Sequence, residues 1–332
     1  MASEARYFNQ SAQSTLASSF DNVEEHNSID GRTVIVECGP GMAITAFYRA
    51  RVFQNDRDLE EAMKRPDIEL GPPPPPMASA RRMNARGISV FYGATDPDVT
   101  VAEVRPPVGS KVLLGRFGIA RTIRLLDVTA LESVRVRGSL FDRTLSHRLE
   151  KADFLATLSK RISMPVLPSD EPFDYLATQA VADFLAAEIQ PPLDGILYPA
   201  VQVTKGAMNV VLFHKSARVA RFAIPAGTEV SATLYQETDD GNEIDCWVTE
   251  ETPQPASQTA IDTGSAPGPG PTLRIDSRKD FAEITDDFDP RPTILALDAA
   301  SIEVRLVKGV TFATEVHSVR RHRFERSHGR PF

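Results

Sequence analysis

Short segments with a β-strand pattern, separated by glycine, proline or polar residues, recur along almost the whole chain of 332 residues. The pattern predicts strands at 32–38, 44–53, 87–94, 111–117, 122–128, 195–198, 208–214, 218–224, 229–236, 244–249, 293–297, 302–314 and 315–324. Helical spacing predicts helices at 58–64, 98–104, 140–162 and 174–189. This order of elements indicates an α+β fold in which a mixed core precedes a β-rich C-terminal extension.

Composition predicts three parts with different organisation. Residues 1–31, rich in Ser, Asn, Gln and Glu, are expected to form an N-terminal arm or a partner helix. Residues 32–215 form the main domain, and 216–332 the β-rich extension, within which the Pro-, Gly- and Ser-rich stretch 251–271 is expected to be flexible. Five consecutive prolines, 72–76, cannot continue a helix or a central strand and predict a polyproline II loop.

The charge and the cysteines narrow the class of protein. A net charge of −8 argues against nucleic acid as a partner, although five arginines after residue 319 form either a solvated tail or an anion-binding tail. No apolar run approaches the ~20 residues that span a bilayer, and no signal peptide is visible, so a cytoplasmic protein without a membrane partner is expected. Cys38 and Cys246 are too few for a disulfide framework and are expected to be buried.

Several common catalytic patterns are missing from the sequence. Gly39 and Gly41 follow a predicted strand, but Ile44 occupies the third glycine position and a second strand follows, which disfavours a dinucleotide-binding fingerprint. The sequence contains no Walker motif and no G-x-S-x-G elbow. None of the six histidines has a ligand-like partner at helical spacing, so no metal is predicted.

Residues 81–105 hold the strongest candidate site. Arg82, Tyr92 and Glu103 lie around one predicted strand, and the glutamate follows the arginine by 21 positions. An arginine can pair with phosphate, an aromatic ring can stack on a substrate ring, and a carboxylate can stabilise an oxocarbenium ion. Together these groups suit a site that binds a dinucleotide and breaks its glycosidic bond.

Two further positions have competing interpretations. Glu103 is flanked by Val101, Ala102 and Val104, which favours a partly buried carboxylate with a functional role over a surface residue. Arg49 lies in an apolar predicted strand, either as a surface residue at the strand end or as a phosphate-binding cation facing a cleft.

The chain resembles the RES-domain family, which is named for an Arg, a Glu and a Ser. The matching pieces occur in family order: F-Y-R-A-R (47–51), L-G-P-P-P (70–74), R-M-N-A-R-G-I-S-V-F-Y-G-A (82–94), A-E-V (102–104), L-L-D-V-T (125–129), T-Q-A-V-A-D-F-L (178–185), D-G-I-L-Y-P (194–199) and N-V-V-L-F (209–213). The resemblance implies an ADP-ribosyltransferase-like fold, a split antiparallel sheet with surrounding helices.

The resemblance also implies a function. Family members are toxins paired with an Xre-type antitoxin, and they cleave NAD by hydrolysis or phosphorolysis or transfer ADP-ribose to a protein. NAD is then a substrate, and no cofactor is implied. Glu103, Arg82 and Tyr92 match the catalytic positions, and residues implied to contact NAD are Tyr48, Arg49, Asn84, Ala200 and Asn209.

The third signature residue departs from the family pattern. The family serine follows a tyrosine in a Y-x-S pattern, but this sequence reads Tyr198-Pro199-Ala200, and Thr204 is the nearest hydroxyl downstream. Three functions therefore stay open. They are an NAD glycohydrolase or phosphorylase, an ADP-ribosyltransferase acting on a protein, and a catalytically impaired interaction protein that keeps the fold.

Overall fold

A computed structural model describes residues 10–139, 141–164, 171–200, 206–239, 241–253, 289–311 and 314–322. Its strands are β1 (Ile35–Cys38), β2 (Ala46–Phe53), β3 (Phe91–Ala94), β4 (Lys111–Ile119), β5 (Ile123–Asp127), β6 (Gly195–Pro199), β7 (Met208–Leu212), β8 (Glu229–Thr238), β9 (Gly241–Glu251), β10 (Leu295–Leu297) and β11 (Glu303–Leu306). Its α-helices are α1 (Gln10–Phe20), α2 (Asp56–Lys64), α3 (Pro66–Glu69), α4 (Pro97–Glu103), α5 (Val128–Leu131), α6 (Leu145–Ser163) and α7 (Glu171–Ala187). The predicted α+β class is confirmed.

Nine of the strands form one mixed sheet in the order β1-β5-β6-β7-β3-β2-β4-β10, with β11 also paired to β4. Every pairing is antiparallel except that of β5 with β6. The strand pairing is shortest near the centre of the sheet, where β2 and β3 share the single registered pair Tyr48 and Ala94. This narrow join separates the sheet into two halves, and α4 packs across it on β2, β3 and β4.

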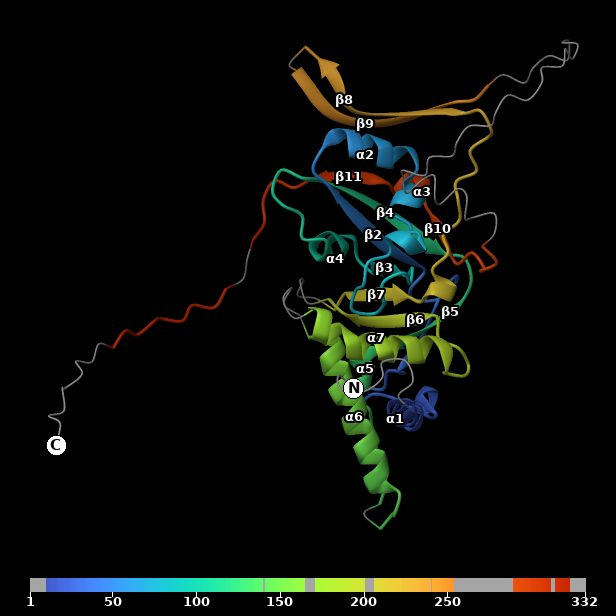
Figure 1. Ribbon diagram of the computed structural model, residues 1–332, viewed down its shortest axis with the longest axis vertical. Helices are drawn as coiled ribbons and strands as arrows, with labels where there is room; N and C mark the ends of the chain where they lie inside the picture. Colours follow the sequence, from blue (N-terminus) through green and yellow to red (C-terminus); the bar gives the residue numbers. More distant parts are fainter. Residues whose placement is uncertain are drawn as a thin grey trace, which may run out of the picture.

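Two large apolar cores lie on opposite faces of the sheet. One joins the sheet to α2 and β8 and includes Phe47, Phe91 and Phe117. The other joins it to α1, α5, α6 and α7 and includes Val211 and Ile196. Figure 1 shows these helices gathered below β6, while α2 and the β8–β9 hairpin lie at the other end of the molecule.

The N-terminal and C-terminal segments are more closely integrated than the sequence indicated. Leu16 and Phe20 of α1 are buried in the helical core, so residues 10–20 pack as part of the domain. The C-terminal part supplies β10 and β11 to the main sheet, and Leu295 is fully buried there. The predicted boundary at 215/216 therefore does not separate two cores, because strands on both sides of it complete one sheet. Most of the predicted flexible segment, 254–271, lies outside the described residues.

Several local predictions differ from the structure. Residues 218–224 form no strand, although Val219 makes an isolated bridge to Leu295. Cys38 is buried as expected, but Cys246 is exposed because its hairpin projects from the body. Residues 315–322 are extended and exposed instead of paired as a strand. Among the helices of the described residues, none is both long and apolar enough to cross a membrane.

Candidate functional site

The arginine loop before β3 is held together by Asn84 and Tyr92. The Tyr92 hydroxyl donates to Asn84 Oδ1 at 2.9 Å and accepts from the Met83 backbone N–H at 3.1 Å. The Asn84 amide nitrogen donates to the carbonyl oxygens of Ser79, Ala85 and Ile88. Both ends of the buried Asn84 side chain thus bond to the protein, so in this structure the side chain holds the loop.

Helices α6 and α7 fix the same loop from the other side. The Arg82 guanidinium donates to the carbonyl oxygens of Ile162 and Met164, both at 2.6 Å, at the C-terminal end of α6. A cation at this position also interacts favourably with the helix dipole. Thr178 of α7 donates its hydroxyl to the Arg82 carbonyl at 2.6 Å. Arg82 is therefore anchored by a two-pronged contact that positions the loop.

Arg81, which sequence reasoning passed over, is the more exposed of the two adjacent arginines. Its guanidinium carbon lies 5.5 Å from the centroid of the Tyr92 ring, within cation–π range. The adjacent arginines at 81 and 82 are the sequence signal that could have identified Arg81, because two neighbouring side chains in a loop can make different contacts. Here one arginine is tied to α6 and the other lies over the aromatic ring.

Glu103 is the last residue of α4, and its carboxylate accepts a hydrogen bond from Asn209 Nδ2 at 2.7 Å. Asn209 is buried on β7, opposite Ala94 of β3. Glu103 itself is exposed, so the expectation of a partly buried carboxylate is wrong. The physical reason is that Glu103 lies on the same side of α4 as the buried Val99 and Thr100, but at the last residue of the helix, so its side chain reaches Asn209 and stays exposed. The buried amide orients an otherwise open carboxylate.

Strand register brings several predicted residues onto one face of the sheet. Ala94 is paired with both Tyr48 and Asn209, and Asn209 is paired with Tyr198, so these side chains share a face. Tyr92, two positions before Ala94, lies on the same face. Tyr48, like Val101 of α4, packs against the small core of Ala50, Val112 and Leu114. Tyr198 is a site residue that sequence reasoning did not select, although it begins the Y-x-S pattern.

Arg49 lies on the opposite face of the sheet. Its guanidinium carbon is 5.2 Å from the centroid of the Phe91 ring, in the core that contains α2. Successive residues of a strand alternate between faces, so Tyr48 and Arg49 cannot both face Glu103. The predicted role of Arg49 as a phosphate-binding cation in this site is therefore not supported by its position.

Burial raises the pKa of both site phenols above its ordinary value. For Tyr198, burial is the main cause, and the nearby Tyr92 and Glu103 raise its pKa further because they disfavour a second negative charge. Both hydroxyls are neutral near pH 7, and that of Tyr92 already donates its proton to Asn84. The site thus combines an exposed carboxylate, two neutral phenols, a buried amide and cationic side chains at the central join of the sheet.

The remaining predicted position, Ala200, directly follows β6, where its backbone N–H donates to the Ala207 carbonyl at 3.3 Å. It lies two residues after Tyr198. Thr204, the alternative hydroxyl, lies outside the described residues. Within the described part of the chain, no group of three or more His, Cys, Asp or Glu side chains could hold a metal ion.

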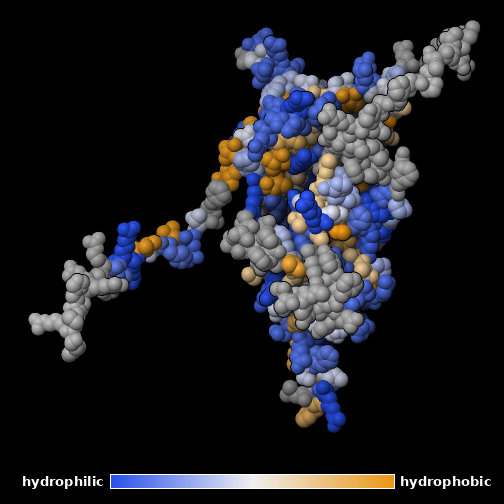
Figure 2. Space-filling model, viewed as in Figure 1, coloured by the Kyte–Doolittle hydropathy of each residue, from blue (hydrophilic) through white to orange (hydrophobic). Residues whose placement is uncertain are grey.

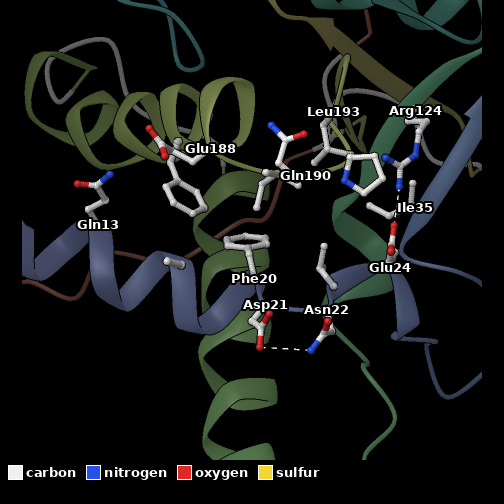
Figure 3. Close-up of a pocket in the computed structure, with 15 residues that line it drawn as sticks. Gln13, Phe20, Asp21, Asn22, Glu24, Ile35, Arg124, Glu188, Gln190 and Leu193 are labelled. Carbon is white, nitrogen blue, oxygen red and sulfur yellow. Dashed lines mark hydrogen bonds and ion pairs between the residues drawn. The ribbon is translucent and has the colours of Figure 1, made fainter.

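Two open surface pockets lie away from this cluster. One, of about 260 Å³, lies between α1, the end of α7 and Arg124, which pairs with Glu24 across it (Figure 3). The other, of about 520 Å³, lies beside α2 and includes Arg51 and Glu69. Neither is lined by a predicted site residue. The chemistry of the join between β2 and β3, and not cavity size, identifies the candidate site.

Comparison with known proteins supports the resemblance seen in the sequence. A family model described as RES domain matches residues 47–235, which is more than half of the chain. The match begins at β2, includes the whole residue cluster around Glu103 and ends within β8. Searches of curated proteins and of solved structures find no match.

Proposed function

Because the chain belongs to the RES-domain family, we propose that it cleaves the bond between nicotinamide and ribose in NAD, as a toxin-like NAD glycohydrolase or phosphorylase. The observation that carries the proposal is the Glu103 carboxylate, which Asn209 holds at 2.7 Å on the sheet face that also carries Tyr92 and Tyr198. This arrangement gives a fixed negative charge beside aromatic side chains, which suits a substrate that develops positive charge on a sugar ring.

The reaction needs little acid assistance because nicotinamide leaves as a neutral molecule from a cationic ring. Positive charge builds up on C1′ and the ring oxygen of ribose as the bond breaks. Glu103 is proposed to stabilise that charge by Coulomb attraction and by accepting a hydrogen bond from a ribose hydroxyl. The buried Asn209 amide keeps the carboxylate in one orientation, which lowers the reorganisation needed during the reaction.

The basic residues of the loop are proposed to divide two tasks. Arg81 is the exposed cation over the Tyr92 ring and is suited to the pyrophosphate of NAD. Arg82 holds the loop against the C-terminal end of α6 and acts as a positioning residue. Tyr198 as a neutral hydrogen-bond donor, and the aromatic rings of Tyr92 and Tyr198, are suited to contact nicotinamide or its ribose.

The exposure of Glu103 leaves room for different acceptors of the ADP-ribosyl group. Water gives hydrolysis, phosphate gives phosphorolysis, and a protein side chain gives ADP-ribosyl transfer. An enzyme that consumes NAD harms its own cell, so an Xre-type antitoxin as partner belongs to the proposal. A catalytically impaired protein is the second candidate, favoured by the alanine at position 200.

Incubation of the purified protein with NAD, with nicotinamide quantified by chromatography, tests the proposal. Nicotinamide should accumulate with time and enzyme concentration. Parallel reactions with phosphate or without it distinguish ADP-ribose from ADP-ribose 1″-phosphate as the second product. Absence of nicotinamide release under all these conditions, from a folded protein, would support the impaired protein instead.

Arg82→Lys is predicted to lower kcat/KM for NAD by about tenfold while keeping the charge. An ammonium cannot reproduce the two-pronged contact with the carbonyls of Ile162 and Met164, so the loop that carries Arg81 should lose its fixed position. Steady-state kinetics and thermal unfolding of the same samples measure the two effects. Arg86→Lys, at an exposed residue of the same loop, is the matched control. Unchanged kinetics in Arg82→Lys would show that Arg82 does not position the loop for NAD cleavage.

Ala200→Ser is predicted to raise NAD turnover by a few-fold to about tenfold. A hydroxyl two residues after Tyr198 restores the family's third residue, and one added hydrogen bond contributes about 0.5–1.5 kcal/mol. Thr204→Val is measured in parallel. If Thr204 already supplies the hydroxyl, Ala200→Ser should have no effect and Thr204→Val should turn over NAD more slowly than wild type. Equal activity of all three proteins would show that no hydroxyl is needed here.

A further inference from the structure

The β8–β9 hairpin presents an unpaired strand with an unusual combination of side chains. It forms a separate two-stranded sheet, and no strand of the described residues pairs with the outer edge of β9. Almost every residue of β9 is exposed, including Ile244, Trp247 (61%) and Val248. Exposed apolar residues on an open strand edge are a template for the addition of another strand.

The same hairpin has a strong negative charge. Residues 229–251 contain the acidic residues Glu229, Glu237, Asp239, Asp240, Glu243, Asp245, Glu250 and Glu251 and no lysine or arginine. Strand β8 packs on the body, where Leu234 is buried and Tyr235 donates its hydroxyl to Asp56 of α2 at 3.0 Å. A strand that adds to β9 must therefore bring positive charge together with apolar side chains.

The C-terminal arm, defined here as residues 314–322, has those properties. The sequence predicts a strand for 315–324, yet in the single chain the arm is extended and exposed, with Val316 and Val319 both 88% exposed. From residue 314 to the last residue the sequence has five arginines and two glutamates. A lone strand of this kind gains little by itself, because strands are stabilised by pairing with neighbours.

We propose that the C-terminal arm of a second copy of this chain adds to the outer edge of β9 as a third strand. The arm supplies backbone hydrogen-bonding groups, two valines and basic residues, and β9 supplies an open edge, an exposed tryptophan and acidic residues. The proposal concerns residues far from Glu103 and does not depend on the proposed function.

The direction of the arm favours a second copy over its own hairpin. The chain is anchored at Val307, whose N–H donates to the Ser110 carbonyl at 3.0 Å, and from there the arm runs away from the body. Figure 1 shows the arm extending from the left side of the molecule and the hairpin lying across its top, and Figure 2 shows apolar residues of the arm exposed between hydrophilic ones. Two copies that exchange arms about a twofold axis cover both arms and both hairpins.

Sedimentation of the full chain across a range of concentrations tests the proposal, with reductant present so that the exposed Cys246 cannot link copies. The chain should form a dimer that dissociates at low concentration and weakens by more than tenfold at about 1 M salt, where exposed charges are screened. Arg320→Glu/Arg321→Glu should weaken the dimer at least tenfold. A chain that is monomeric at all concentrations, or a dimer indifferent to this double variant, would overturn the proposal.

A charge exchange and a fluorescence signal locate the contact. Glu243→Lys/Glu250→Lys, at exposed residues of β9, should also weaken the dimer, and combining these changes with the two arginine reversals in one chain should restore it. Trp247 is the only tryptophan of the sequence, so its emission should shift to shorter wavelength as the dimer forms. A shift independent of concentration in a monomer would mean that the arm binds its own hairpin and would overturn the exchange. If the combined variant does not regain the dimer, the proposed contact between these arginines and these glutamates is wrong.

Discussion

Glu103→Gln should lower the rate of nicotinamide release from NAD by about 10²–10³-fold while the protein stays folded. The substitution keeps the shape of the side chain and an oxygen that can accept the Asn209 hydrogen bond, so only the negative charge is removed. That charge is the group proposed to stabilise the ribosyl cation. Because the hydrogen bond from Asn209 then joins two neutral groups, the free energy of unfolding should fall by about 1 kcal/mol, which leaves the protein folded.

Kinetics and thermal unfolding of the same preparation separate a catalytic effect from a structural one. Glu150→Gln is the matched control, since Glu150 is an exposed glutamate on α6 and should be neutral in both measurements. The loss should appear in kcat more than in KM, because the charge acts in the transition state. A folded Glu103→Gln protein with wild-type nicotinamide release would show that the carboxylate does not take part in cleavage.

The strand and helix patterns were sufficient to predict the class of fold and most of the elements around the site. Period-two alternation identified β2 and β3, and an Asp before the helix identified α4, although the capping side chain is Asp96. Such patterns reflect local burial and capping, which a sequence records directly. Strand pairing is different, because it depends on residues far apart in the chain. The addition of β10 and β11 to β4 could not be read from segments almost 200 positions away.

Side-chain direction explains where the predicted site was incomplete. Tyr48 and Arg49 are neighbours in one strand, and only the strand's register decides which of them faces Glu103. The same rule places Tyr198 and Asn209 together, across β6 and β7. Motif matching selected Arg82 by position, but the contact with Ile162 and Met164 that ties it to α6 comes from tertiary structure. The Glu103 exposure follows from its place at the end of a helix.

The Asn209→Asp substitution tests the positioning of Glu103 and should lower NAD cleavage by about ten- to a hundredfold near pH 7. It replaces the amide that donates to Glu103 at 2.7 Å with a carboxyl of the same shape. A hydrogen bond to a charged group contributes about 1.5–3 kcal/mol, and two carboxylates this close cannot both ionise easily. The pair should therefore retain a proton to a higher pH than a free carboxyl does. Glu103 would then lose charge, orientation or both.

The pH dependence distinguishes this mechanism from a simple packing defect. A carboxyl pair whose pKa is raised in the folded state binds its proton more tightly than in the unfolded state, so its contribution to stability is present at low pH and is lost as the pH rises. The unfolding free energy of Asn209→Asp should therefore fall relative to wild type as the pH rises from about 4, the ordinary pKa of a carboxyl, through the raised pKa of the pair. Asn209→Ala, which removes the donor without adding charge, should lose activity with no such slope, and Asn242→Asp on the exposed hairpin should show neither effect. A pH-independent stability difference in Asn209→Asp would mean that the two side chains do not interact, and the site would then lack the oriented carboxylate on which cleavage of NAD is proposed to depend.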